Sequence, residues 1–206
     1  MMVLYGGRRS PFVRRVSVWL ALQNQPFERR DVQVFGADFE GFLAISPLGR
    51  VPALVLSGGQ SLIESAAIVD YLEDIAPADL RLIPPTGEPR RAVMHVMACA
   101  NAVAEKAVAL VYEVERRPAH YVWPDWQHRL INQVGLGLQA LEAMLPPSGW
   151  CGGDAPNGAD VTAVTAIDFV DTIASYSPPQ ALPRLRALSA LANAREDFST
   201  SKPSSP

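Results

Sequence analysis

Residues 46–73 read SPLGRVPALVLSGGQSLIESAAIVDYLE, and they carry the clearest local structure in the chain. Val51–Leu56 predicts a strand with a proline in its first turn, and the Gly-Gly pair after it predicts a hairpin into a second strand at Ser61–Ile63. A helix is predicted over Ser65–Ile75, because Pro77 follows and cannot continue it. The order is therefore strand, strand, helix.

The residues before this stretch add the rest of a small mixed sheet. Val3–Tyr5 predicts a first strand, and Ser10-Pro11 predicts the start of a helix that ends within residues 23–26. Serine is a preferred N-cap and proline is favoured in the first helical turn. Residues 27–35 alternate weakly and predict a further strand. This order is typical of a mixed sheet with helices packed on it.

Downstream, residues 81–89 contain three prolines and a glycine and predict a linker. We therefore expect one domain at residues 1–80, a second at residues 90–198 and a flexible tail at residues 199–206. The second domain should be helical throughout, with helices at residues 90–116, 124–145, 158–174 and 183–194. Gly135 and Gly137 fall inside the second of these helices, where they permit close packing or a bend.

Composition narrows the class of protein. The 206 residues are 49% hydrophobic with a formal net charge of −3, which favours a globular protein and argues against a nucleic-acid partner. No apolar run approaches the roughly 18 residues of a membrane span, and the first residues do not resemble a signal peptide. We expect a soluble, cytoplasmic protein without a membrane partner. Cys99, Cys151 and the isolated histidines predict neither disulfides nor a metal site.

Three junctions in the first domain hold residues that could carry chemistry, since ligands of α/β sheets bind where strands and helices meet loops. They are Ser10-Pro11, Val51-Pro52 and Glu64-Ser65. The Gly-rich start of the chain lacks the Gly-Lys-Ser/Thr ending of a phosphate-binding loop.

Four segments at this spacing resemble the glutathione S-transferase family over nearly the whole chain. They are SPFVRRV at 10–16, SPLGRVPAL at 46–54, ESAAIVDYLE at 64–73 and GADVTAVTAIDFV at 158–170. The resemblance, to a bacterial, serine-type member, implies an α/β thioredoxin-like N-terminal domain followed by an all-α C-terminal domain. It also implies a homodimer that uses glutathione as co-substrate against a small, hydrophobic electrophile in detoxification, with peroxidase or isomerase activity as variants. The alternative is a non-catalytic binding or regulatory protein of the same fold.

The chemistry of glutathione directs attention to Ser10. Its thiol is mostly protonated at neutral pH, and lowering a thiol pKa from about 8.5 to roughly 6.5 requires ~2.7 kcal/mol. A hydrogen bond to a charged group supplies ~1.5–3 kcal/mol, so one hydroxyl at a helix start is sufficient. The related glutaredoxins have Cys-Pro-x-Cys here, and Ser10 and Val13 replace both sulfurs, which argues against dithiol chemistry. The alternatives are that Ser10 is only an N-cap, or that Arg9 or Tyr5 occupies the catalytic position.

The other junctions resemble the residues that hold glutathione in this family. Val51-Pro52 resembles the cis-proline site, where the residue before proline pairs its backbone with the cysteinyl part. Glu64 would bind the γ-glutamyl ammonium, and Ser65 with its backbone N–H would bind the carboxylate. Arg50 is placed to meet the glycyl carboxylate. A simple helix cap and a surface arginine are the alternative interpretations.

Other residues carry weaker signals. Phe12, Tyr112 and Trp123 are candidates for a second-substrate pocket, although packing between helices explains such aromatic residues equally well, as it does Trp126. A basic run, Arg8, Arg9, Arg14 and Arg15, either attracts anionic ligands or forms a solvated face. Asn157 and Asp160 predict a capping box that serves folding.

Overall fold

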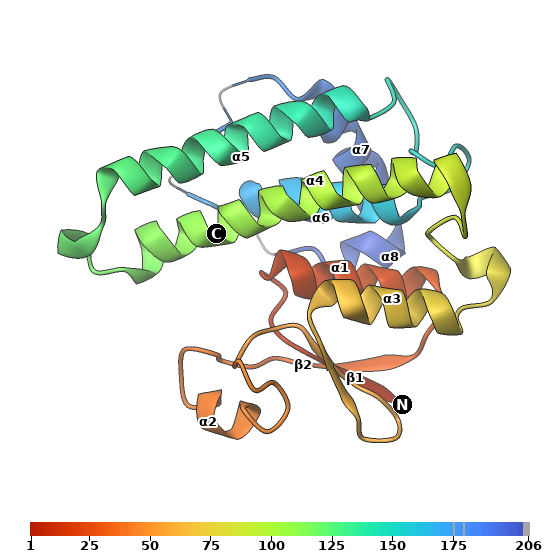
Figure 1. Ribbon diagram of the computed structural model, residues 1–206, viewed down its shortest axis with the longest axis horizontal. Helices are drawn as coiled ribbons and strands as arrows, with labels where there is room; N and C mark the ends of the chain where they lie inside the picture. The colour runs from red at the N-terminus through yellow and green to blue at the C-terminus, as the bar shows by residue number, and fades with distance from the viewer. Residues whose placement is uncertain (175, 179, 204–206) are drawn as a thin grey trace. The chain divides into compact units, whose positions relative to one another are not determined.

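The computed structural model describes residues 1–174, 176–178 and 180–203 (Figure 1). The chain divides into two compact units, Met1–Leu82 with Glu196–Lys202, and Ile83–Arg195 with Pro203. The first unit includes a short helix, α8 (Glu196–Ser199), whereas the sequence pattern predicts most of these residues in the second domain. Of the tail expected at residues 199–206, Ser201 is buried, and residues 204–206 lie outside the described part.

A four-stranded mixed sheet with strand order β2-β1-β3-β4 builds the first unit. The strands are β1 (Met2–Tyr5), β2 (Phe27–Arg30), β3 (Ala53–Val55) and β4 (Ser61–Ile63). β1 runs parallel to β2 and antiparallel to β3, which runs antiparallel to β4. The register aligns Tyr5 with Ala53 and Ala53 with Ile63. The end of β1, the start of β3 and the end of β4 therefore lie at one end of the sheet.

Two helices, α1 (Pro11–Leu22) and α3 (Ser65–Ile75), lie side by side on one face of this sheet (Figure 1). Both begin where the sequence predicts. They are joined through Glu73, whose Oε1 accepts hydrogen bonds from Trp19 Nε1 at 2.9 Å, Gln23 Nε2 at 2.7 Å and the Leu82 backbone N–H at 3.0 Å. Their apolar faces and the inward residues of the sheet form a closed core that includes Leu4, Trp19, Leu20, Leu54, Ile68 and Leu72.

The region between β2 and β3 differs from the prediction. β2 stops at Arg30 rather than at residue 35, because the chain turns, with the Gly36 N–H donating to the Gln33 carbonyl at 2.9 Å. A short helix, α2 (Phe39–Phe42), follows, and its four residues are too few to show a helical period in the sequence. β3 starts at Ala53 instead of Val51, directly after a cis Val51-Pro52 peptide bond.

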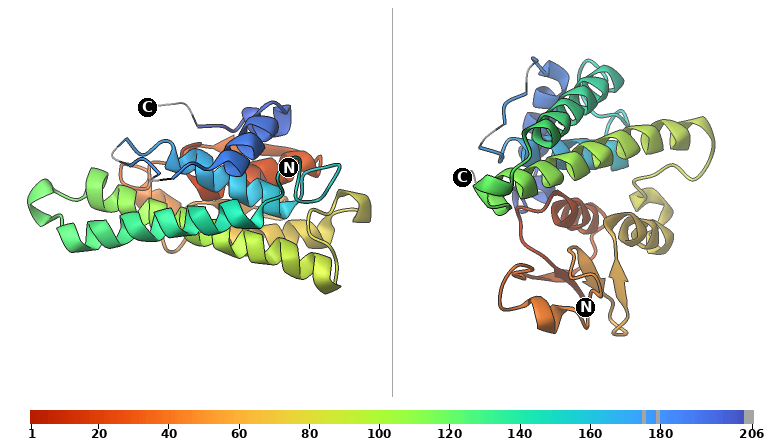
Figure 2. Two further views of the ribbon diagram at one scale, coloured as in Figure 1. Left: turned by 90° about the horizontal axis from the view of Figure 1, so that it is seen from above. Right: turned by 60° about the vertical axis from the view of Figure 1, so that its left-hand side comes forward.

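The second unit contains the four predicted helices, which are confirmed to within a few residues. They are α4 (Gly87–Val111), α5 (Pro124–Met144), α6 (Gly158–Val170) and α7 (Pro183–Asn193), with shorter turns at η2 (Tyr112–Arg116) and η3 (Ala119–Tyr121). The turn η1 (Ala78–Leu80) belongs to the first unit. Figure 2 shows α4 and α5 as a long pair of neighbouring helices. A Cβ at Gly137 would lie 2.5 Å from Val103 Cγ2, so this glycine permits the close approach of α5 to α4.

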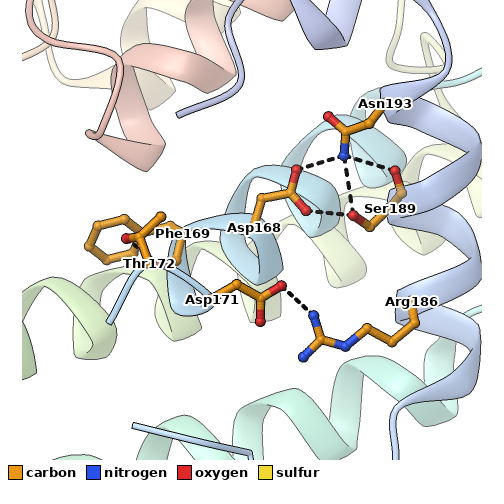
Figure 3. Close-up of polar contacts among 7 residues, drawn as sticks. All are labelled: Asp168, Phe169, Asp171, Thr172, Arg186, Ser189 and Asn193. Atoms are coloured by element: carbon orange, nitrogen blue, oxygen red, sulfur yellow. Dashed lines mark hydrogen bonds and ion pairs between the residues drawn. The ribbon is translucent and has the colours of Figure 1, made fainter. Parts of the chain in front are cut away.

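Helix α6 is buried along its whole length. The predicted capping box at its start is confirmed: the Asn157 side chain accepts from the Ala159 N–H at 2.8 Å, and Asp160 Oδ2 accepts from the Asn157 N–H at 2.8 Å. At its other end, Asp168 accepts hydrogen bonds from Ser189 Oγ at 2.5 Å and Asn193 Nδ2 at 2.8 Å (Figure 3). These bonds satisfy a buried carboxylate and attach α7 to α6.

One helix of the described chain, Gly87–Arg116, is long and apolar enough by composition to cross a membrane. The sequence-based expectation concerned an apolar run, and charged residues such as Glu105 and Lys106 interrupt the apolar sequence of this helix. In the structure it has a buried face that packs against α5 and α6 and includes Val96, Ala100, Val103 and Ala107. The apolar residues of the helix thus contribute to the core of the second unit.

Candidate functional site

The three predicted junctions meet at one end of the sheet, and Gly6 is the point where two of them touch. Gly6 follows β1 with φ 134°, a conformation that side chains rarely adopt. A Cβ on Gly6 would lie 2.4 Å from Val13 Cγ2 and 2.9 Å from Val51 Cβ. The first turn of α1 and the residue before Pro52 therefore both pack directly on this glycine, and a larger residue would push them apart.

Ser10 is the N-cap of α1, and its Oγ accepts a hydrogen bond from the Val13 N–H at 3.3 Å. The side chain is half-buried. A hydroxyl that accepts one hydrogen bond still has its own proton to donate. The capping role and the predicted role toward a sulfur therefore use different parts of the same group and do not exclude each other.

Tyr5 and Arg9, the other candidates for the catalytic position, lie in different surroundings. The Tyr5 hydroxyl accepts a hydrogen bond from Arg30 Nη1 at 3.3 Å, and its ring lies 5.9 Å from that of Phe42. These contacts are those of a residue that packs on the sheet. Arg9 is exposed, in the loop just before Ser10.

The loop before β3 is shaped by Ser46, which lies in the SPLGRVPAL segment but is not one of the predicted site residues. Ser46 is fully buried, its Oγ donates to the Arg50 carbonyl at 2.8 Å and accepts from the Arg50 N–H at 3.2 Å. Gly49 turns the chain with φ 60°, and a Cβ there would lie 2.3 Å from Phe39 Cε2. The start of the SPLGRVPAL segment thus sets the path of the backbone that leads to Val51.

Glu64 precedes α3 with φ 66° and ψ 120°, which is rare for a residue with a side chain. Such conformations cost about 1–3 kcal/mol and concentrate at functional sites. Its carboxylate lies 3.2 Å from Arg50 Nη1, and the two side chains are 54% and 62% exposed. The structure thus brings together the residue predicted for an ammonium and the residue predicted for a carboxylate.

Ser65, the first residue of α3, is buried and accepts a hydrogen bond from Arg15 Nη2 at 2.7 Å. The guanidinium comes from α1 and is 4% exposed. The neighbouring Arg14 is equally buried, at 2%. A solvated face is therefore wrong for these two arginines, because α1 is covered on nearly all sides; Arg8 and Arg9 are exposed.

The predicted second-substrate residues are divided between the two units. Phe12 is a half-buried residue of α1, whereas Tyr112 and Trp123 are 47% and 62% exposed at the two ends of the segment that joins α4 to α5. The buried Glu113 holds this segment by accepting from the Trp123 N–H at 3.0 Å and from Arg117 Nε at 2.8 Å. A pocket that these three aromatic residues share stays a prediction.

A separate cavity of about 230 Å³ lies in the second unit, between the segment that follows α5 and helix α7. It is lined by Leu145, Pro146, Ser148, Gly149, Arg184, Ala187, Leu188 and Leu191. None of the predicted site residues is among them.

The described residues contain no group of three or more His, Cys, Asp or Glu side chains that could hold a metal ion. Burial raises the pKa of the Cys99 thiol. Burial and the nearby Asp160 carboxylate raise the pKa of the Cys151 thiol well above its ordinary value. Neither cysteine is therefore set up as a thiolate nucleophile, and the predicted site residues offer hydroxyls, carboxylates, arginines and backbone groups instead.

Comparisons with known proteins identify the family of the chain. The family model described as "Glutathione S-transferase, N-terminal domain" matches residues 4–85, and the model described as "Glutathione S-transferase, C-terminal domain" matches residues 124–190. Maleylacetoacetate isomerase from Pseudomonas aeruginosa is 31% identical, covering 98% of this chain and 96% of that protein. An uncharacterized GST-like protein from Escherichia coli K12 is 28% identical, covering 98% of both.

A solved structure gives the same result. The glutathione S-transferase from Methylobacillus flagellatus, crystallised with glutathione bound, superimposes with a TM-score of 0.89 at 28% identity, covering 99% of this chain and 100% of that one. The N-terminal thioredoxin-like fold and the helical C-terminal domain are thus those of a full-length relative. The two domain models match in order, and the relatives span the whole chain, so this protein belongs to the glutathione S-transferase family.

Proposed function

We propose that this protein binds glutathione at the sheet end where β1 ends and β3 begins, and that Ser10 activates the thiol for attack on a small electrophile. The observation that carries the proposal is the position of the Ser10 hydroxyl. It caps α1 as an acceptor, keeps its proton, and lies at the sheet end to which Val51 and Glu64 also belong. The glutathione bound in a relative of the same fold supports this choice of ligand.

The remaining residues of the sheet end match the charges of glutathione. Glu64 binds the γ-glutamyl ammonium, and the Ser65 hydroxyl with its backbone N–H binds the neighbouring carboxylate. Arg50 binds the glycyl carboxylate, and the Val51 backbone pairs with the cysteinyl residue. The Arg50–Glu64 contact of 3.2 Å is between exposed side chains, so binding of the two ends of glutathione can replace it.

The reaction then follows from the stabilised thiolate. The Ser10 O–H donates to the sulfur, and the thiol proton passes to solvent. The sulfur forms a bond to the electrophilic carbon, and the electron pair of the broken bond leaves with the leaving group or is protonated. A non-catalytic member of the family would have no need for the Ser10 proton at this position.

Glutathione-dependent isomerisation is the second candidate, and the maleylacetoacetate isomerase that spans nearly the whole chain favours it. In this reaction the thiolate adds to a conjugated double bond, the new single bond rotates, and elimination releases the isomer and restores the thiolate. An acidic substrate would be attracted by the exposed Arg8 and Arg9. Transfer consumes glutathione and isomerisation does not, so the glutathione balance during turnover distinguishes the two.

The test is to measure the pKa of the bound thiol, from the absorbance of its thiolate, in the wild-type protein and in Ser10→Ala. Loss of a hydrogen bond to a charged group, about 1.5–3 kcal/mol, raises the pKa of the bound thiol by about one to two units. Ser17→Ala is the matched control, because Ser17 lies on the same helix and its hydroxyl donates to the Val13 carbonyl at 3.1 Å. This control should leave the pKa of the thiol unchanged.

Two results would overturn the proposal. A wild-type complex whose thiol ionises as it does in buffer would remove the catalytic role, and no binding of glutathione at all would favour a non-catalytic protein. Equal conjugation rates for wild type and Ser10→Ala would remove Ser10 from the mechanism.

We also expect a homodimer, which sedimentation equilibrium measures.

A further inference from the structure

The contact between Arg15 and Ser65 joins α1 to the first residue of α3. Arg15 Nη2 donates to Ser65 Oγ at 2.7 Å, and both residues are at least nine-tenths buried. A guanidinium has donors and no acceptor, so the serine oxygen is the acceptor in this bond. The Ser65 proton must therefore be directed to a different partner.

Three features coincide at Ser65. Its hydroxyl proton is available to an acceptor, its backbone N–H belongs to the first turn of an eleven-residue helix, and a buried positive charge lies within hydrogen-bond distance. Charges interact more strongly in a buried environment than in water. This combination favours an anionic ligand atom over a neutral one.

We propose that Arg15 is a positioning residue, which holds the Ser65 hydroxyl for the α-carboxylate of the γ-glutamyl group and makes binding depend on that carboxylate. The inference rests on the proposed function, because it concerns the same glutathione site. Arg15 acts through Ser65, and the selectivity it provides is for γ-glutamyl compounds whose α-carboxylate is free.

A purely structural role is less suited to this contact. Glu73, eight residues further along α3, already joins that helix to α1 through Trp19 and Gln23. A second tie between the same two helices, placed at the helix start that faces the site, has its main effect on the geometry of Ser65. Loss of Arg15 should therefore change ligand selectivity in addition to stability.

The experiment compares three ligands by calorimetry. They are glutathione, 4-aminobutyryl-cysteinyl-glycine, which lacks the α-carboxylate, and glutaryl-cysteinyl-glycine, which lacks the ammonium. The wild-type protein should bind glutathione about 10–100-fold more tightly than the first analogue, as expected for charge-assisted hydrogen bonds. Arg15→Met should reduce this ratio to within about threefold of unity, while the ratio between glutathione and the second analogue stays as in wild type.

Two further variants keep the test decisive if Arg15→Met folds poorly. Arg15→Lys retains the charge and should lower in part the carboxylate ratio, which is the affinity for glutathione divided by that for the first analogue. In a Ser65→Ala background, Arg15→Lys should not lower this ratio further. Arg14→Lys is the matched control, since Arg14 is equally buried on the same helix but turned by about 100° from Arg15. It should keep the full carboxylate ratio whatever its melting temperature.

The outcomes separate this inference from the proposed function. If wild type does not bind glutathione, both fail. If wild type binds glutathione and prefers it to the decarboxylated analogue, but folded Arg15 variants keep the same ratio, the role of Arg15 alone is overturned. A Ser65→Ala protein that keeps the full ratio overturns it as well.

Discussion

Helices α3 and α6 both begin with a polar pair, and they use it in opposite ways. At α6, Asn157 and Asp160 accept hydrogen bonds from each other's backbone N–H groups in a closed box, and Asp160 is fully buried. At α3, the Glu64 side chain makes no capping hydrogen bond among the described residues, adopts φ 66° and lies beside Arg50. One helix start is satisfied by its own residues, and the other keeps its polar groups directed to its surroundings.

This difference shows how one local motif serves either folding or binding. A closed box removes the cost of buried N–H groups and leaves nothing for a ligand. An open start keeps both its charge and an uncommon backbone conformation. The binding of a ligand there can offset the free-energy cost of that conformation. We therefore expect substitutions at the start of α6 to change stability and substitutions at the start of α3 to change the binding of glutathione.

Asp160→Ala should give the largest effect, on stability alone. The substitution leaves the N–H groups of Asn157 and Cys151 without their carboxylate, and we expect a loss of about 2–4 kcal/mol in the free energy of unfolding. Urea titration measures the loss. Asp171→Ala, which removes a half-exposed ion pair with Arg186 (Figure 3), should cost under about 1 kcal/mol. Weaker glutathione binding by folded Asp160→Ala protein, with stability unchanged, would contradict the comparison.

Glu64→Gln should give the reverse pattern. Removing the charge weakens glutathione binding by about 10–100-fold, because a charge-assisted hydrogen bond to the ammonium is lost. Stability should change by less than about 0.5 kcal/mol, because the Arg50–Glu64 pair is more than half exposed. Calorimetry and urea titration measure the two quantities, with the exposed Glu40→Gln as control. A large loss of stability with unchanged affinity would show that Glu64 serves the fold.

Glycine substitutions probe the backbone at both helix starts. At Glu64, glycine should be more stable than alanine by about 1–3 kcal/mol, because only glycine relieves the positive φ. At Asn157, where φ is −123°, relief of a positive φ cannot contribute, and the difference should be under about 1 kcal/mol from capping preference alone. Equal differences at the two positions in thermal unfolding would remove the argument from strain.

The pH dependence of stability should show the smallest effect. Burial raises the pKa of Asp160 above its ordinary value of 3.8, although hydrogen bonds from Cys151 and Asn157 act in the other direction. The folded state therefore holds this proton more tightly than the unfolded state does, so this group stabilises the fold at low pH and loses that contribution as pH rises through the raised pKa. Between pH 4 and neutrality, Asp160→Asn should lack this decline. Urea midpoints that fall in parallel for both proteins would contradict the assignment.

Much of the fold was predictable because its signals are local. Helices begin at Ser10-Pro11 and at the Asn157–Asp160 box, and the Gly-Gly pair forms the turn between two strands. These features act within one turn of the chain, so their meaning does not depend on distant residues. The strand predicted over residues 27–35 was too long, because its weak alternation does not show the turn that Gln33 and Gly36 form in its last part.

The positions of Ser10, Val51 and Glu64 were proposed from sequence, but their meeting at one sheet end required the register of β1, β3 and β4. The burial of Arg14 and Arg15 and the bond from Arg15 to Ser65, fifty positions apart, were also decided only in three dimensions. The sequence of a run of arginines does not show whether their side chains are exposed or buried. The sequence alone determined where helices and turns begin, because backbone preferences are local; tertiary structure decided which charged groups meet, because that depends on how distant segments pack.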